Sequence, residues 1–160
     1  MAISEGDKIP AGSFAVKTAD GIEQMSTDDL FGGKKVVLFS VPGAFTPTCS
    51  AQHLPGFVQK ADEIKAKGVD TIACMAVNDP FVMGAWGENQ QVGDKVVMLA
   101  DGSAAFTNQI GMELDLVDRG LGVRSQRFAM IVNDGTVEKV LLDEAGAFEA
   151  SSAESVLENL

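Results

Sequence analysis

Side chains that bind metals or form disulfides are scarce in this chain of 160 residues. It has one histidine and two cysteines, Cys49 and Cys74, which lie far apart in the sequence. Without carboxylates, these three side chains cannot supply the full ligand set of a zinc site. Two cysteines also allow only a single bridge, too little for the disulfide framework of a small secreted domain. We therefore expect no metal, no other cofactor and a reducing compartment.

Long apolar runs and positive charge are also lacking. No apolar segment approaches the roughly 18 residues that cross a bilayer. The N-terminal stretch MAISEGDKIP has neither the basic start nor the apolar core of a signal peptide. The 12 lysines and arginines face 23 acidic residues, and the formal net charge of −11 repels nucleic acid phosphates and anionic lipid. We expect a cytoplasmic chain with no nucleic acid partner and no membrane partner.

What is present is the composition of a single globular domain. Hydrophobic residues make up 46% of the chain and charged residues 22%. At this length such a chain can bury a substantial core. There is no internal repeat, low-complexity tract or block of like charges, so we expect one domain over residues 1–160.

Apolar segments with strand and helix patterns alternate along the chain. Strands are predicted at 36–41, 69–77, 95–100, 128–132 and 137–142, and helices at 47–67, 80–89, 104–110 and 152–160. The first two strands and the helix between them form a βαβ unit, so part of the sheet is parallel. An Asp-Gly turn at 134–135 predicts a hairpin. The segment 112–126 fits no element and is a candidate functional loop. This order predicts an α/β, thioredoxin-like fold with a central mixed sheet flanked by helices.

The strongest local signal is the start of the helix at 47–67. Thr46 suits the N-cap and Pro47 the first helical position, because the missing N–H of proline would have no partner there. Cys49 is then the third helical residue. Free backbone N–H groups and the helix dipole favour a thiolate at this position. The capping geometry also predicts that the Thr46 hydroxyl turns back toward Cys49.

A thiolate in this position can attack the O–O bond of a peroxide. The site must then hold the leaving oxygen and stabilise its growing negative charge. Thr46, backbone N–H groups and an arginine can do this. Among Arg119, Arg124 and Arg127, we favour Arg127 because it precedes the strand FAMIV, whose start can lie beside the Cys49 loop. A solvated position or a structural ion pair is the alternative for Arg127.

The other two thiol and imidazole side chains have structural interpretations. Cys74 is centred in an apolar strand, which favours inert core packing over a resolving or sensing role. His53 lies one helical turn after Cys49 and suggests a Cys-His pair. Its position deeper in the helix favours packing or a bond to a backbone carbonyl.

The segment PGAFTPTCS resembles the active-site segment of the type II peroxiredoxins. HLPGFV, KAKGVDTIACMAVNDPFVMGAW, LADG and RFAMIVNDG resemble further segments of that family in the same order. The resemblance implies a thioredoxin fold and the reduction of hydrogen peroxide, alkyl hydroperoxides and peroxynitrite. It implies Cys49 as the peroxidatic nucleophile, Thr46 as the hydroxyl that bonds peroxide and sulfur, and Pro42 as a shield of the pocket. It also implies Arg127 as the family arginine, with Arg124 as a weaker candidate for a supporting cation.

The departures from the family concern recycling of the oxidised cysteine. Some relatives carry a resolving cysteine near the C-terminus, whereas residues 148–160 contain none. We therefore expect a one-cysteine mechanism, in which glutathione with glutaredoxin, or thioredoxin, reduces the sulfenic acid of Cys49. The 160 residues include no glutaredoxin-like segment, so we expect that reductase to be a separate protein.

Family members commonly form homodimers through the face near the site. Phe45, Phe81 and Trp86 are candidates for its apolar contacts, with core packing as the alternative. A second functional hypothesis is a redox sensor, disulfide relay or holdase that uses oxidised Cys49. A third, a thioredoxin-fold binding module without chemistry, is disfavoured by the intact set of Thr46, Cys49 and Arg127.

Overall fold

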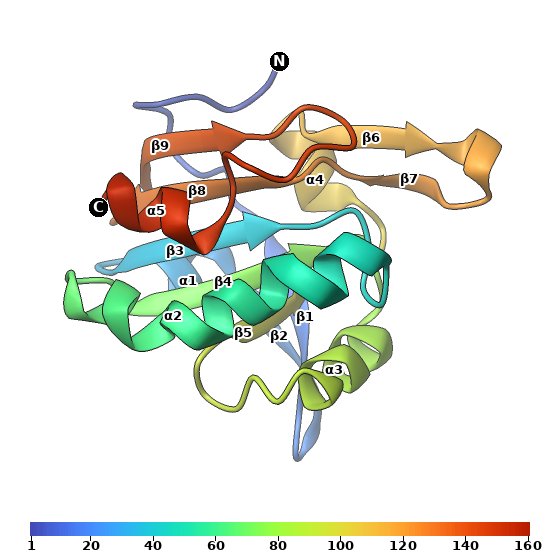
Figure 1. Ribbon diagram of the computed structural model, residues 1–160, viewed down its shortest axis with the longest axis horizontal. Helices are drawn as coiled ribbons and strands as arrows, with labels where there is room; N and C mark the ends of the chain where they lie inside the picture. The colour runs from blue at the N-terminus through green and yellow to red at the C-terminus, as the bar shows by residue number, and fades with distance from the viewer.

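The core of the protein is a mixed seven-stranded sheet in the order β2-β1-β5-β4-β3-β8-β9. The computed structural model describes residues 1–160 (Figure 1). The strands of this sheet are β1 (Ser13–Thr18), β2 (Gly21–Ser26), β3 (Lys35–Ser40), β4 (Thr71–Ala76), β5 (Val97–Ala100), β8 (Phe128–Asn133) and β9 (Thr136–Leu142). The helices are α1 (Thr27–Phe31), α2 (Leu54–Ala66), α3 (Pro80–Asn89), α4 (Ala105–Gln109) and α5 (Ala153–Glu158). None of them is both long and apolar enough to span a bilayer.

Strand β3 lies in the interior of the sheet, as the sequence predicted. It pairs parallel with β4 and antiparallel with β8. Its side chains alternate between two apolar clusters, with Val37 and Phe39 on one face and Val36 and Leu38 on the other. Helices α2, α3 and α5 cover the first face, and α1 and α4 cover the second (Figure 1). The expected mixed sheet flanked by helices is confirmed.

The C-terminal hairpin also matches the prediction, and two of the helices begin at capping side chains. Asp134 and Gly135 have φ angles of 48° and 77°, the left-handed values that a tight two-residue turn requires. Asp79 caps α3, where its side chain accepts from the N–H of Val82. Ser152 caps α5 in the same way, accepting from Ser155.

The structure adds two hairpins that the sequence did not predict. β1 and β2 form an antiparallel pair at one edge of the sheet, and β2 is mostly exposed, so it carries no clear apolar alternation. In the unassigned segment 112–126, β6 (Glu113–Leu116) and β7 (Gly122–Ser125) pair around a single 3₁₀ turn, η2 (Val117–Arg119). Figure 1 shows this second hairpin projecting from the body of the molecule.

Candidate active site

The helical segment that follows β3 begins at Pro47 and places Cys49 third, as predicted. Its first full turn is a π-helical turn, η1 (Cys49–His53), in which the N–H of Leu54 donates to the Cys49 carbonyl. Pro55 follows as the second residue of α2, where its missing N–H accompanies the departure from regular α-helical hydrogen bonding. The backbone N–H groups of Thr48 and Cys49 donate to no protein acceptor. These free donors give the start of the helix a local positive potential.

No hydrogen bond joins the Thr46 hydroxyl to Cys49, although the capping geometry predicted that this hydroxyl turns toward Cys49. The hydroxyl donates to the Gly43 carbonyl at 2.7 Å. The loop makes a tight turn there, with Phe45 in the left-handed region at φ 62° and the Thr46 N–H also directed at Gly43. The hydrogen of the Thr46 hydroxyl is therefore used within the turn, and the hydroxyl oxygen can still accept a hydrogen bond.

Arg127 lies against the sulfur of Cys49. Its Nη2 is 3.2 Å from Cys49 Sγ, and its Nη1 is 2.9 Å from His53 Nδ1. Arg127 immediately precedes β8, and the β8 residue Phe128 pairs with Ser40 at the end of β3. That end of β3 leads into the Cys49 loop, so the predicted placement of Arg127 is confirmed. The structural ion pair considered as an alternative is absent.

His53 is fully buried between Arg127 and a backbone carbonyl. Its Nε2 is 3.0 Å from the Ser151 carbonyl oxygen, which confirms the expected backbone bond. Because a carbonyl can only accept, Nε2 carries the hydrogen, and Nδ1 accepts from Arg127. Burial, and then the positive charge of Arg127, lower the pKa of His53 from 6.5 to about 3, while Ser151 and Asp143 act in the opposite direction. The contact with Arg127 was missed in the sequence, which gives no local signal for it.

Buried His53 is expected to make the protein less stable as the pH falls. In the unfolded chain this imidazole takes up a proton below about 6.5, whereas in the folded state it remains neutral down to about pH 3. The unfolded state therefore binds more protons in this window, and the free energy of unfolding falls by up to about 1.4 kcal/mol per pH unit. Urea unfolding at several pH values between about 7 and about 4 measures this slope.

The matched comparison for this prediction is His53→Gln, which removes the titrating group and leaves the carboxylates unchanged. The difference in unfolding free energy between the variant and the original protein is expected to change across this pH window. Parallel stability curves for the two proteins would show that His53 is not the buried neutral base described here.

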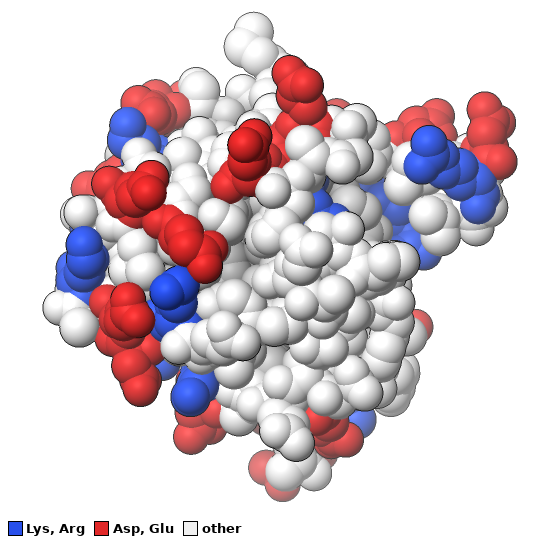
Figure 2. All heavy atoms as spheres, in the orientation of Figure 1, with Lys and Arg blue, Asp and Glu red and all other residues white.

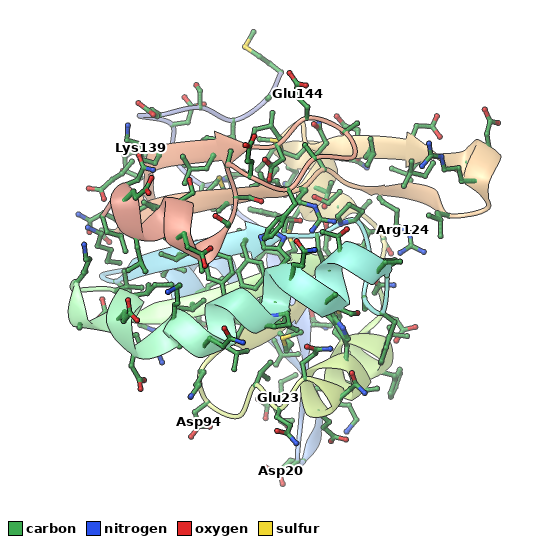
Figure 3. All side chains as sticks on the ribbon, in the orientation of Figure 1. Asp20, Glu23, Asp94, Arg124, Lys139 and Glu144 are labelled. Carbon is green, nitrogen blue, oxygen red and sulfur yellow. The ribbon has the colours of Figure 1, made fainter.

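Three of the four predicted site residues line one cavity of about 450 Å³. Pro42, Thr46 and Arg127 contribute to its wall, while Cys49 lies beneath the surface and is 0% exposed. Much of the remaining lining comes from the projecting hairpin and from the loop after β9: Leu114, Leu116, Arg119, Leu121 and residues 143–147. Figure 3 shows Glu144 in that loop with its side chain directed outward. A second cavity, of about 560 Å³ between β1 and α3, includes none of the predicted site residues.

Arg124 does not contact Cys49. Its Nε donates to the Leu121 carbonyl at 2.8 Å and its Nη1 to the Pro42 carbonyl at 3.3 Å, so it joins the projecting hairpin to the active-site loop (Figure 3). Arg124 packs closely over Gly43, where a Cβ atom would lie 2.8 Å from Arg124 Nη1 and 3.1 Å from Thr46 Cγ2. The geometry thus separates Arg124, which braces the loop, from Arg127, which reaches the sulfur.

Trp86 packs in the core, which is the alternative to a dimer contact considered for it. It is fully buried, and its indole N–H donates to Ser50 Oγ at 3.0 Å. Phe45 and Phe81 are 53% and 64% exposed, so the other two aromatic candidates remain at the surface.

Cys74 lies on β4 and is fully buried, as its apolar neighbours predicted. Burial, together with the nearby Cys49, raises the pKa of the Cys74 thiol well above its usual value. Both cysteines are free. A protonated thiol is a poor nucleophile and a poor resolving group.

Comparisons with known proteins agree with this geometry. Residues 4–157 match the Redoxin family. Peroxiredoxin-2B of Arabidopsis thaliana is 49% identical over 99% of this chain and 98% of its own length. Reduced Prx3 from Vibrio vulnificus in complex with hydrogen peroxide is 48% identical, with a TM-score of 0.94 over 98% of both chains. The Plasmodium falciparum antioxidant protein, a 1-Cys peroxiredoxin, is 29% identical, with a TM-score of 0.91 over 98% of both chains.

These similarities extend over nearly the whole chain. They confirm the thioredoxin-like fold predicted from the order of the elements and the family suggested by PGAFTPTCS. The chain belongs to the type II peroxiredoxins and is a thiol peroxidase.

Proposed function

We propose that Cys49 is the nucleophile of the peroxidase reaction and that Arg127 is the cation that activates it. The observation that carries this proposal is the contact of 3.2 Å between Arg127 Nη2 and Cys49 Sγ. A guanidinium is always charged and donates from a planar fork, so it stabilises a thiolate and still has donors for an oxygen. The free N–H groups of Thr48 and Cys49 add to the same potential.

The chemical step is a displacement at oxygen. The thiolate of Cys49 forms an S–O bond as the O–O bond of the peroxide breaks, which oxidises the sulfur to a sulfenic acid. The departing oxygen leaves with the bonding electron pair and takes up a proton as water or an alcohol. Thr46 and Arg127 line the cavity above the sulfur, where they can hold the peroxide oxygens and stabilise the charge on the leaving oxygen. The relative from Vibrio vulnificus that binds hydrogen peroxide supports this assignment.

The cavity supports organic hydroperoxides as substrates beside hydrogen peroxide. Its volume of about 450 Å³ is far larger than hydrogen peroxide requires. Leu114, Leu116 and Leu121 give it an apolar wall suited to an alkyl group. The hydroperoxide group would then meet Arg127 at the base of the cavity.

The sulfenic acid of Cys49 is proposed to be reduced by a thiol from another molecule, in a one-cysteine cycle. Cys74 is the only other cysteine, and its buried, protonated thiol is a poor resolving group. Cys49 is itself 0% exposed, so the first turn of its helix must open before an external thiol reaches the sulfur. We propose glutathione with glutaredoxin, or thioredoxin, as the reductant. The 1-Cys peroxiredoxin from Plasmodium falciparum supports this type of cycle.

Replacing Cys74 with serine is expected to leave peroxide turnover close to that of the original protein. The change removes a thiol that takes no part in the proposed cycle, and serine is of similar size. Turnover of hydrogen peroxide is measured with glutathione plus glutaredoxin and, separately, with thioredoxin plus its reductase. Loss of turnover with both systems in a folded Cys74→Ser protein would overturn the one-cysteine proposal.

We also propose that two copies of the chain associate through the face that carries Phe45 and Phe81. Figure 2 shows the surface over the start of the Cys49 helix and over α3 almost free of charged side chains, whereas acidic residues crowd other parts of this view. Phe45 and Phe81 are exposed apolar side chains in the loop before that helix and in α3. A chain with a net charge of −11 can bring two copies together most easily where charge is absent.

Replacing Phe81 with aspartate is expected to shift the protein from dimer to monomer, because it places a charge in each half of a symmetric contact. Sedimentation velocity measures the change. Ile22→Asp is the matched control, since Ile22 is another exposed apolar residue (40%) but lies on β2 at the edge of the sheet. Equal masses for the two variants would contradict this dimer face.

A further inference from the structure

We propose that His53 and Asp143 are positioning residues that hold Arg127 against the sulfur of Cys49. This inference rests on the proposed roles of Cys49 and Arg127 and adds the residues that fix their geometry. Neither His53 nor Asp143 contacts the sulfur. They act through a chain of hydrogen bonds that runs from the end of β9 to the guanidinium.

The chain begins at the carboxylate of Asp143, which is buried (5% exposed) just after β9. Its Oδ1 accepts from the N–H groups of Glu149 and Ala150 at 3.0 and 2.7 Å. Its Oδ2 accepts from the N–H and the hydroxyl of Ser151 at 3.2 and 2.5 Å. Four donors on one carboxylate fix the backbone of residues 149–151, and with it the direction of the Ser151 carbonyl.

The Ser151 carbonyl then fixes His53. It accepts from Nε2 at 3.0 Å, which sets the tautomer and leaves Nδ1 as an acceptor. Three phenylalanine rings surround the imidazole, with centroids 4.9 to 5.7 Å away: Phe39, Phe57 and Phe148. The imidazole therefore has one orientation, with its lone pair directed at Arg127.

His53 in turn directs the guanidinium fork. Nδ1 accepts from Arg127 Nη1 at 2.9 Å, and Nη2 of the same planar group then lies 3.2 Å from Cys49 Sγ. Because the fork is rigid, fixing one terminal nitrogen fixes the direction of the other. Asp143 also acts on Arg127 through the backbone, since its N–H donates to the Arg127 carbonyl at 3.0 Å. Both the side chain and the backbone of Arg127 are thus tied to the same aspartate.

A neutral imidazole suits this position because a cation beside Arg127 would repel it. A neutral acceptor also leaves the full charge of the guanidinium available to the thiolate, which a carboxylate in place of His53 would partly neutralise. Residues 143–147 line the substrate cavity as well. The wall of the cavity and the orientation of Arg127 therefore depend on one structural unit.

The test uses two substitutions at His53 that separate its two nitrogens. His53→Asn offers an amide oxygen near the place of Nδ1, whereas His53→Gln offers an amide nitrogen near the place of Nε2. We expect His53→Gln to lower kcat/KM for hydrogen peroxide by about 10- to 100-fold, as the loss of an orienting partner commonly does. We expect His53→Asn to recover part of that loss. Alkylation of reduced Cys49 by iodoacetamide near pH 6 is expected to be slowed more by His53→Gln than by His53→Asn.

The second measurement is nitrogen NMR of His53 in the intact protein. The imidazole is expected to be neutral with the hydrogen on Nε2 at about pH 5, where a free histidine is mostly charged. In Asp143→Asn this single signature is expected to be lost. The matched control is Asp101→Asn, because Asp101 is a buried carboxylate that accepts from the Phe106 N–H and from the N–H and hydroxyl of Thr107, away from Arg127.

The outcomes separate this inference from the proposed function. The positioning role would be overturned if folded His53→Gln kept the original rates of alkylation and turnover. It would also be overturned if Asp143→Asn and Asp101→Asn lost the NMR signature of His53 equally. Either result would leave the nucleophile assignment intact, provided that Cys49→Ser still lacks activity. Unchanged activity in Cys49→Ser would instead overturn the proposed function itself.

Discussion

Replacing Cys49 with serine is expected to reduce peroxide consumption to the rate of the buffer, a loss of more than about 10⁴-fold. The serine hydroxyl stays protonated near neutral pH, and no base lies beside it to remove the proton, since Arg127 is a cation and the His53 acceptor already binds Arg127. Consumption of hydrogen peroxide under excess reductant measures the loss.

The control for this experiment is Cys74→Ser, which removes the other thiol and is expected to retain activity. If Cys49→Ser consumed peroxide at the original rate, Cys49 would not be the nucleophile. A stable mixed disulfide between Cys49 and one client protein, with negligible turnover under every reductant, would instead favour the sensor or relay hypothesis.

Replacing Arg127 with glutamine is expected to lower kcat/KM for hydrogen peroxide by about 10²- to 10³-fold, the usual effect of removing one donor to developing negative charge. The guanidinium lies 3.2 Å from the sulfur and lines the cavity where the leaving oxygen departs. The change therefore removes a charge that stabilises both the thiolate and the negative charge on the leaving oxygen. Arg127→Lys is expected to recover only part of the loss, because an ammonium cannot bond His53 and the sulfur from one rigid fork.

Steady-state turnover and alkylation of Cys49 by iodoacetamide together measure the effect of Arg127. Arg124→Gln is the matched control, since Arg124 is close in sequence but bonds only the carbonyls of Pro42 and Leu121. If Arg124→Gln and Arg127→Gln lowered kcat/KM equally, the conformation of the active-site loop, and not the charge beside the sulfur, would determine the rate.

Much of the fold could be predicted because its central elements are specified by local sequence. Strand β3 is a continuous apolar run because both of its faces are buried. The Asp134-Gly135 turn and the caps Asp79 and Ser152 form from side chains within a few residues of the backbone that they bind. For the same reason, the place of Cys49 in the first turn of its helix could be predicted from Thr46 and Pro47.

The elements that escaped prediction lack such local signals. Strand β2 has four exposed residues in succession and owes its structure to pairing with β1. For Trp86 the sequence left core packing and a surface contact open, because the bond from its indole N–H to Ser50 joins two different helices. The Thr46 hydroxyl bonds Gly43 because the preceding turn presents a carbonyl to it, a feature that residue types alone do not reveal.

In the active site, too, the features that could be predicted differ from those that depend on contacts between distant segments. The approach of Arg127 to Cys49 was predicted because a strand start and a helix start meet at one edge of the sheet. His53 was expected to bond a backbone carbonyl. Its contact with Arg127 and the parts played by Ser151 and Asp143 were not predicted, since they join segments far apart in the chain. Buried polar groups require hydrogen-bond partners, so a partner for a buried histidine can be expected from the sequence. Which residue supplies it cannot be read from the sequence.

The most direct test of the peroxidase site is stopped-flow mixing of the reduced protein with hydrogen peroxide, observed through the fluorescence of Trp86. This single tryptophan bonds Ser50, the neighbour of Cys49, and so reports on the helix turn that carries the sulfur. We expect a fast fluorescence change with a second-order rate constant of at least about 10⁴ M⁻¹ s⁻¹, and no such change in Cys49→Ser. A reduced Cys49 that reacts no faster than free cysteine would contradict this expectation.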